Sequence, residues 1–400
     1  MRRRRNSRRF LLVFALLGLL LTTACTSSGG FYTPGSHAKS SKALAPLRLS
    51  IAGPAAGATG VSVATEFPIT TSGTVTSASL VASDGTRISG SFARGDRTWI
   101  PDTQLSYRTK YRLEVSAEQG RISKGRTLNF TTGGRGRTES SELYAPDGQT
   151  VGVGMPVVVK FGVSVPPSRR AAVERRLFVT AQPATEGAWH WYSGSEVHYR
   201  PKEYWKPGTK VSVRLGTGGL ELAHNRFGYS DRLASFTIGS QVITKVDNAS
   251  HTASVYKDGE LIKQLPVSLG KPEAPTSSGI HVVLEKSADK IFDSETFGLS
   301  HADGGYKLKV YWDVRFTWGG EFVHAAPWST ADQGKRNVSH GCVNLSTENA
   351  QWFYDLSTVG DLVEVVGTET KVTPGDGWTD WNFNWDEFKA GGALNGSAAP

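Results

Sequence analysis

The sequence predicts a mainly β protein: two tandem immunoglobulin-like β-sandwiches, a mostly-β third domain with one clear helix, and a small aromatic-rich C-terminal segment. Three observations predict this class. The composition, with 38% hydrophobic and 20% charged residues, 45 glycines and 18 prolines, is typical of a globular protein with many turns. Short stretches of alternating polar and apolar residues are separated by Gly, Pro and Asp turns. One arrangement of such stretches also occurs twice along the chain.

Residues 1–24 form a predicted export signal that lies outside the fold. The basic run MRRRRNSRRF leads into an apolar stretch that suits a signal peptide and is short for a membrane span. Ser7 to Phe10 also carries a twin-arginine pattern. The signal ends in LTTAC, where Ala24 before Cys25 resembles a bacterial lipobox, so we expect Cys25 to be lipidated and to anchor the chain to the membrane. The alternative is cleavage near Ala24 that leaves Cys25 as a free thiol.

The net charge of +9 belongs mostly to this signal. Six of the charges are arginines within the first nine residues, and without them the formal charge falls from +9 to +3. No basic run with interleaved aromatic residues remains after the signal, so we expect no nucleic-acid partner. Residues 25–47 are rich in Ser, Gly, Ala and Pro, which predicts a lipidated flexible tether.

The internal repeat defines the two predicted sandwiches, residues 48–134 and 135–240. TWIPDTQLSYRTKYRLEV, from Thr98, and HYRPKEYWKPGTKVSVRL, from His198, each place a Pro nine residues before a Lys that opens an alternating strand. Each copy is followed by Phe-Thr-x-Gly, at Phe130 and at Phe236. Two such copies are typical of tandem β-sandwiches.

The two sandwiches carry no motif of their own that points to chemistry. Trp189, Trp191 and Trp205 are compatible with a ligand platform, but aromatic residues in sandwiches usually pack in the core. We therefore expect these three tryptophans to be packing residues and the two domains to act as spacers.

Residues 241–368 form the predicted third domain. Alternating strands run from Gln241 to Gly270 and recur through the stretches GIHVVLEK, YKLKVYWDVRFTW and EFVHAA. Ser346 is a candidate N-cap for a helix through TENAQWFYDLS. In the C-terminal segment, residues 369–400, large aromatics recur at helical spacing, which predicts one helical face docked on the third domain; they are Trp378, Trp381, Trp385 and Phe388.

The chemistry of the chain is expected around Cys342. Cysteine reacts as the thiolate, so a nucleophilic Cys342 needs a base, and both His324 and His340 are candidates. Gly341 permits a backbone conformation that aims consecutive N–H groups at an oxyanion, although a simple turn glycine is the alternative. A zinc site formed by His324, His340 and Cys342 is a further alternative, but it lacks the short paired ligand spacing of common zinc motifs, so we expect no metal and no cofactor.

HAAPWSTADQGKRNVSHGCVNLS, from His324 to Ser346, resembles the signature of the YkuD-type L,D-transpeptidases, in which a His precedes Ser-His-Gly-Cys-x-Asn by about fifteen residues. The whole arrangement, with a lipoprotein signal, two immunoglobulin-like domains and an aromatic C-terminal segment, is similar to actinobacterial members of that family. The resemblance covers nearly the whole mature chain.

The resemblance implies a role for each residue of the motif. Cys342 would be the nucleophile and His324 its general base, oriented by the backbone carbonyl of Ala325, where relatives often have Ser. His340 would hold the loop, and the backbone N–H groups of His340, Gly341 and Cys342 would bind the oxyanion. Residues 292–318 would form a lid. The substrate cleft would be lined by Tyr306, Trp318, Gly319, Gly320, Ser339 and Asn344.

The family also implies the reaction and the partners. Cys342 would attack the diaminopimelate carbonyl of a peptidoglycan stem tetrapeptide, release D-Ala, and pass the acyl group to a second stem as a 3→3 cross-link. Carbapenem β-lactams would acylate Cys342. Three alternatives remain open: an L,D-carboxypeptidase, an enzyme that attaches protein to the wall by the same thioester, and a non-catalytic wall-binding lipoprotein.

Overall fold

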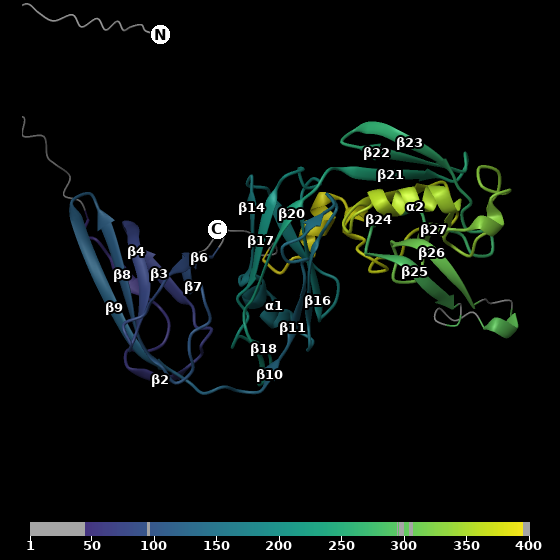
Figure 1. Cartoon of the computed structure of the whole chain (residues 1–400). Helices are drawn as coiled ribbons and strands as arrows, with labels where there is room; N and C mark the ends of the chain where they lie inside the picture. Colours follow the sequence, from purple (N-terminus) through teal and green to yellow (C-terminus); the bar gives the residue numbers. More distant parts are fainter. Residues whose placement is uncertain (1–44, 94–96, 294, 296–299, 304–306, 395–400) are drawn as a thin grey trace, which may run out of the picture. The chain divides into compact units, whose positions relative to one another are not determined.

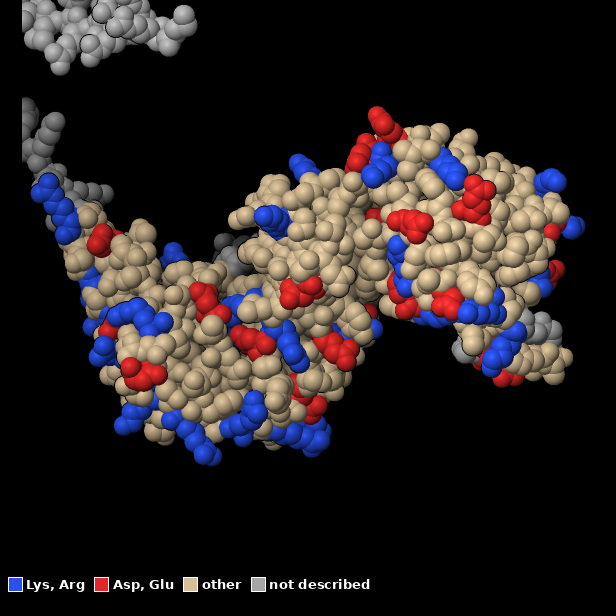
Figure 2. All heavy atoms as spheres, viewed as in Figure 1, with Lys and Arg blue, Asp and Glu red and all other residues tan. Residues whose placement is uncertain are grey.

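The computed structural model describes residues 45–93, 97–293, 295, 300–303 and 307–394, and residues Leu47–Pro400 form one compact unit. The predicted signal, Cys25 and most of the tether lie outside the described residues. Within the described part, no helix combines the length and apolarity that a membrane span needs. Charged side chains of both signs are interspersed over the face that Figure 2 shows.

The first sandwich packs a four-stranded sheet against a five-stranded one (Figure 1). Strand β8 alternates buried and exposed positions, as its sequence predicts, and its inward side chains meet Phe67, Trp99 and Phe130 in the core. The first sheet contains, in spatial order, β1 (Leu49–Ile51), β3 (Phe67–Thr71), β7 (Thr98–Pro101) and β6 (Gly90–Phe92). The second contains β2 (Ala58–Val61), β9 (Ile122–Thr132), β8 (Lys110–Gln119), β4 (Thr74–Ala82) and β5 (Arg87–Ile88).

The second sandwich repeats this design with two four-stranded sheets, a small third sheet and the helix α1 (Pro167–Glu174). One sheet contains β11 (Ser141–Tyr144), β13 (Val157–Phe161), β16 (Glu196–Pro201) and β15 (Gly187–Trp191). The other contains β12 (Thr150–Val151), β20 (Arg232–Ile238), β17 (Lys210–Leu215) and β14 (Leu177–Gln182). The small sheet contains β10 (Thr138–Glu139), β19 (Arg226–Gly228) and β18 (Glu221–Ala223).

The three tryptophans of this sandwich are core residues, as predicted. Trp189, Trp191 and Trp205 are all buried, and each indole N–H donates a hydrogen bond inside the domain. Buried indoles with a satisfied N–H are typical of packing residues.

The third domain contains two sheets and the helix α2 (Thr347–Leu356) (Figure 1). Its core lies between the sheets and includes Ala350 and Phe353 of α2. The Ser346 hydroxyl accepts a hydrogen bond from the Asn349 N–H, so the predicted N-cap is confirmed. The five-stranded sheet contains β23 (Glu260–Pro266), β22 (Thr252–Lys257), β21 (Val242–Asp247), β29 (Leu362–Val366) and β24 (Gly279–Val282). The four-stranded sheet contains β25 (Glu285–Asp293), β26 (Lys307–Arg315), β27 (Phe322–Ala325) and β28 (Val343–Leu345). Short 3₁₀ turns are η2 (His301–Asp303) and η3 (Pro327–Ser329).

The aromatic C-terminal segment differs from its prediction in two ways. Of the four aromatics, Trp385 and Phe388 lie on an α-helix, the short α3 (Trp385–Ala390). Trp378 lies in a bend and Trp381 on the separate 3₁₀ helix η4 (Asp380–Asn382). The expected single helical face across all four aromatics is therefore wrong.

The segment also contacts more of the chain than the third domain alone. The Trp381 indole N–H donates to the Gly154 carbonyl of the second sandwich at 2.8 Å, while the Asn382 amide bonds Ile280 of the third domain. The guanidinium of Arg200, from β16, lies over the rings of Trp381 and Phe388. The segment thus joins the second sandwich to the third domain.

Candidate active site

The parallel pairing of β27 with β28 sets the geometry of the site. His324 is in register with Asn344, and Cys342 lies two residues before Asn344, so the three side chains share one face of the sheet. His324 and Cys342 are both buried and line the same cavity of about 200 Å³. The structure therefore brings together the two residues to which the sequence assigned the central roles. The cavity is lined by Phe292, Leu308, Val310, His324, Trp328, Val338, Ser339, His340, Cys342 and Asn344.

The His324 imidazole is held in one tautomer. Its Nδ1 lies 2.9 Å from the Ala325 carbonyl oxygen, which can only accept, so Nδ1 carries the proton and Nε2 keeps a free lone pair. Burial lowers the pKa of His324 to about 4, while the Ala325 carbonyl acts in the opposite direction. His324 is thus neutral at pH 7 and able to accept a proton through Nε2.

The Cys342 thiol is protonated in the resting site. Burial is the main cause that raises its pKa to about 12; the carboxyl groups of Glu321 and Asp313 act in the same direction, and the Phe322 backbone N–H acts in the opposite direction. The thiol also makes a long hydrogen bond, 3.7 Å, to the Gly320 carbonyl. A nucleophile in this setting has to lose its proton to a base during attack, because a free thiolate is not stable there.

Ser339 holds the turn that carries the nucleophile. Its hydroxyl donates to the Cys342 carbonyl at 2.6 Å and accepts from the Gly341 N–H at 3.1 Å. Gly341 has φ of +119°, which favours glycine, so the permissive-backbone prediction agrees with the geometry. The Gly341 N–H, one of the predicted oxyanion donors, is however occupied by Ser339.

His340 supports the loop rather than the thiol. Its side chain is exposed, and Lys271 Nζ donates to its Nε2 at 3.0 Å. The Lys271 backbone N–H also bonds the Ser339 carbonyl. Burial and the Lys271 charge lower the pKa of His340, so it is neutral at pH 7.

Two residues near the site, Ser329 and Gln333, were not predicted from the sequence. The Asn344 amide donates to the Ser329 hydroxyl at 3.1 Å, and Gln333 donates to both the Ser329 hydroxyl and the Ala326 carbonyl. These bonds tie the segment after β27 to β28. No motif marks Ser329 or Gln333, because their role depends on how the loop folds back.

The predicted cleft residues fall into different places. Gly320 lies next to the thiol, whereas the Gly319 N–H bonds Asp376 of the C-terminal segment. Trp318 does not line the cavity; its ring packs edge-on against Trp378, 6.4 Å between centroids. Trp318 is 40% exposed, and its assignment to the substrate cleft stays a prediction. Tyr306 lies outside the described residues.

The residues expected to form a lid, 292–318, include the end of β25, the turn η2 and β26, which pairs with β25 as a hairpin, and their role as a lid stays a prediction. Phe292, Leu308 and Val310 of this hairpin cover Cys342 with apolar side chains. Leu308 and Val310 were not predicted from the sequence as cavity residues.

The zinc alternative receives no support from the described residues. The group of potential ligands that lie close enough to share an ion there is Asp293, Glu295 and His301, which includes none of the three predicted zinc ligands. Asp293 is in addition paired with Lys307 at 2.8 Å.

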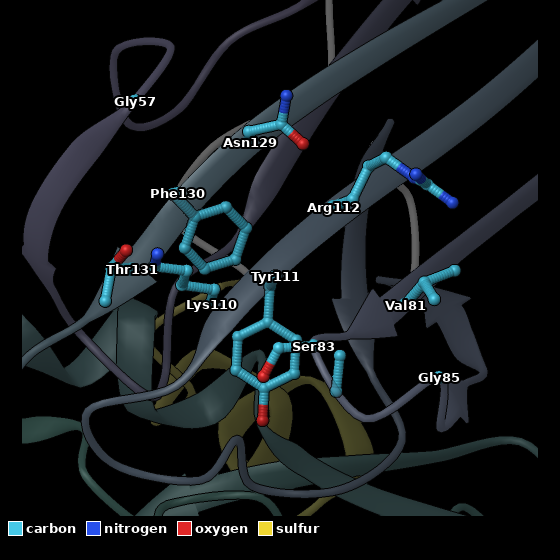
Figure 3. Close-up of a pocket in the computed structure, with 11 residues that line it drawn as sticks. Gly57, Val81, Ser83, Gly85, Lys110, Tyr111, Arg112, Asn129, Phe130 and Thr131 are labelled. Atoms are coloured by element: carbon cyan, nitrogen blue, oxygen red, sulfur yellow. The ribbon is translucent and has the colours of Figure 1, made fainter.

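A larger hollow lies on the first sandwich (Figure 3). It is lined by strand side chains and turns, including Lys110, Arg112 and Asn129. This hollow contains no cysteine, histidine or carboxylate among its lining residues, so it lacks the pairing of a thiol with an imidazole that the cavity around Cys342 shows.

Comparison with known proteins identifies the family of the chain. A model described as the L,D-transpeptidase catalytic domain (YkuD) matches residues 241–365, and one described as a bacterial Ig domain matches residues 58–221. The chain is 37% identical over 340 residues to L,D-transpeptidase 2 of Mycobacterium tuberculosis (strain CDC 1551 / Oshkosh), covering 84% of this chain and 83% of that protein.

Two further relatives show the same similarity. L,D-transpeptidase 5 of Mycobacterium tuberculosis (strain ATCC 25618 / H37Rv) is 38% identical over 332 residues, 80% of this chain and 71% of that protein. A solved structure of the L,D-transpeptidase LdtMt1 in complex with imipenem is 38% identical, with a TM-score of 0.49, and covers 56% of this chain and 97% of that one.

Proposed function

The chain belongs to the L,D-transpeptidases with a YkuD catalytic domain, and from this premise we propose that it forms 3→3 cross-links between peptidoglycan stem peptides through a thioester on Cys342. The observation that carries the proposal is the pairing in one cavity of a protonated thiol with a neutral imidazole whose Nδ1 is already occupied by the Ala325 carbonyl.

The first half-reaction acylates the enzyme. His324 Nε2 takes the thiol proton while Sγ attacks the carbonyl carbon at the L-centre of meso-diaminopimelate in a tetrapeptide stem. The tetrahedral intermediate collapses, the bond to D-Ala breaks, and the imidazolium gives its proton to the leaving amine. A thioester on Cys342 remains.

The second half-reaction transfers the acyl group. The side-chain amine of diaminopimelate on a second stem attacks the thioester, and His324 accepts the amine's proton. Sγ then leaves and takes the proton back from the imidazolium. The free thiol is restored and a diaminopimelate–diaminopimelate bond is formed.

Backbone N–H groups of the Ser339–Cys342 turn would stabilise the oxyanion. The Gly341 N–H can join them only if it exchanges its bond to the Ser339 hydroxyl for the oxyanion. Each such donor contributes a factor of about 10²–10³ in rate.

Carbapenems fit the same chemistry as inhibitors. The strained β-lactam carbonyl replaces the scissile amide, and ring opening leaves an acyl group on Sγ. The apolar cover of Phe292, Leu308 and Val310 limits the access of water to that thioester.

We further propose that the chain is exported and anchored through a lipid on Cys25. The tether of residues 25–47 would let the enzyme reach above the membrane, since a flexible chain of about 20 residues spans roughly 25 Å. The two sandwiches would extend that reach into the wall.

The products formed from defined stem peptides test the proposal. Purified enzyme is incubated with a disaccharide tetrapeptide and the mixture is analysed by mass spectrometry. We expect a dimer with release of D-Ala, no dimer with Cys342→Ala, and a rate lower by about 10²–10⁴ with His324→Ala. A tripeptide without dimer would instead identify an L,D-carboxypeptidase, and a wild-type enzyme that leaves the tetrapeptide intact would contradict the proposal.

A further inference from the structure

Glu321 is a buried carboxyl group next to the site that the mechanism above does not use. It lies between Gly320 and the first residue of β27. Its Oε1 accepts from the Ser277 N–H at 2.7 Å, and its Oε2 accepts from the Ser277 hydroxyl at 2.5 Å. Ser277 belongs to the segment before β24, so this double hydrogen bond ties the start of β27 to the other sheet of the domain.

The same side chain lies against the turn that carries the nucleophile. A Cβ added to Gly341 would be 3.5 Å from Glu321 Cγ and 3.6 Å from Oε1, ordinary contact distances. The two neighbours of Glu321 reach the sulfur directly, through the Gly320 carbonyl and the Phe322 N–H. The Glu321 side chain therefore lies against Gly341, and its two chain neighbours contact the Cys342 sulfur.

We propose that Glu321, held by its two hydrogen bonds from Ser277, is a positioning residue for Cys342. It holds the Gly341–Cys342 turn against β27 and places an ionisable charge beside the thiol. This inference rests on the proposed function, because it takes Cys342 as the nucleophile.

The charge gives the residue a signature that a purely structural group lacks. Burial raises the pKa of Glu321 to about 7, the two Ser277 donors act in the opposite direction, and Asp376 raises the pKa. The carboxylate is charged above that pH and opposes the developing thiolate; below it, the neutral acid does not. We therefore expect Cys342 to be acylated more slowly above pH 7 in the wild type than in a variant with a neutral residue at position 321.

The other titratable groups around Cys342 can be separated from this effect. His324 and His340 both have lowered pKa values, so they stay neutral between pH 7 and 9. Lys271 faces His340, because its Nζ donates a hydrogen bond to the His340 Nε2. Asp313 of β26 is the exception: it is buried, neither carboxyl oxygen has a hydrogen-bond partner, and burial raises its pKa to about 7. An Asp313→Asn variant has to be measured beside any Glu321 variant.

Glu321→Gln separates charge from position. The amide oxygen can accept a hydrogen bond from the Ser277 N–H, and the amide NH₂ can donate to the Ser277 hydroxyl. Both hydrogen bonds are therefore kept while the charge is removed. Glu321→Ala removes both hydrogen bonds with Ser277, and Ser277→Ala removes the one from the Ser277 hydroxyl. Asp361→Asn is a matched control, because Asp361 is another buried carboxyl of this domain whose pKa burial raises to about 7, but its hydrogen bond is to Thr358.

The experiment measures the rate of Cys342 acylation by imipenem from pH 5.5 to 9, by loss of β-lactam absorbance, with intact mass confirming the adduct. At pH 8.5 we expect Glu321→Gln to react about 10-fold faster than the wild type, equivalent to one pKa unit of the thiol. At pH 5.5 the two should agree within about 2-fold. Glu321→Ala and Ser277→Ala should be slower than Glu321→Gln at every pH, and Asp361→Asn should keep the wild-type profile.

Two results would overturn the inference while leaving the proposed function intact: a Glu321→Gln profile that follows the wild type, or a Glu321→Ala enzyme as fast as Glu321→Gln at every pH. If Asp313→Asn alone removes the pH dependence of the acylation rate, the charge effect belongs to Asp313, and the inference is also overturned. A wild type that forms no adduct at any pH would overturn the proposed function and this inference together.

Discussion

His324 and Cys342 are both uncharged at neutral pH, and this decides how the nucleophile is made. The thiol and the imidazole are each buried, which disfavours a thiolate–imidazolium pair at rest. The sequence could identify both residues, because the Ser-His-Gly-Cys motif and the upstream histidine are local patterns. It could not show their protonation, which depends on burial by residues such as Phe292 and Val310 that are distant from both in the chain.

The low pKa of His324 predicts where activity is lost in acid. A base with a pKa of about 4 stays free of its proton down to that pH, so the rate of acylation should fall only below about pH 5 and not near 6.5. The measurement is the rate of imipenem acylation of the double variant Glu321→Gln/Asp313→Asn, which lacks both carboxyl groups with a pKa of about 7 near the thiol, with circular dichroism to confirm that the protein is folded. An acid limb centred near pH 6.5 would contradict the buried, neutral histidine.

Ser339 offers a second test at this scale. Ser339→Ala removes both hydrogen bonds of the turn, each worth about 1 kcal/mol, and leaves the Cys342 carbonyl without its donor. We expect a lower melting temperature and slower acylation, and Ser339→Thr, which keeps the hydroxyl, should retain most of both. An alanine variant as fast as the wild type would show that Ser339 does not hold the nucleophile in place.

At the scale of elements, local signals predicted well and long-range ones did not. The N-cap at Ser346 and the alternating strand β8 depend on neighbouring residues, and both are confirmed. The aromatic stripe failed as one helix because Trp378 and Trp381 gain more from contacts with the second sandwich and the third domain than from a continued helix. Contacts between distant segments are not encoded in a local period.

The Ser346 cap predicts a stability difference. Ser346→Ala should lower the free energy of unfolding by about 1 kcal/mol, because the Asn349 N–H loses its acceptor, while Ser346→Asp should keep most of the stability. Urea unfolding followed by circular dichroism measures both. Equal unfolding midpoints for the alanine and wild-type proteins would contradict the cap.

At the scale of the whole molecule, the C-terminal segment carries a buried charge cluster against the second sandwich. His198 lies between Asp380, 2.9 Å from its Nδ1, and Glu196, 2.8 Å from its Nε2. Burial lowers the pKa of His198, but the two carboxylates outweigh burial and raise it to about 9. No local pattern marks this cluster, since His198 and Asp380 are far apart in the chain.

The raised pKa of His198 predicts how stability depends on pH. A histidine whose folded pKa lies above its unfolded value of about 6.5 stabilises fully below that pH and loses its contribution as the pH rises through 9. The melting temperature should therefore fall between pH 7 and 10, and His198→Gln should reduce that fall. A wild-type melting temperature that stays constant over this range would contradict a charged His198.

The central claim is that Cys342 is an acyl-forming nucleophile activated by His324. Its most direct test is intact mass and peptide mapping of the full chain after incubation with imipenem at pH 7. We predict one adduct per chain, located on Cys342, no adduct with Cys342→Ala, and acylation slowed by about 10²–10⁴ with His324→Ala. An adduct elsewhere, or none on the folded wild-type protein, would contradict the account.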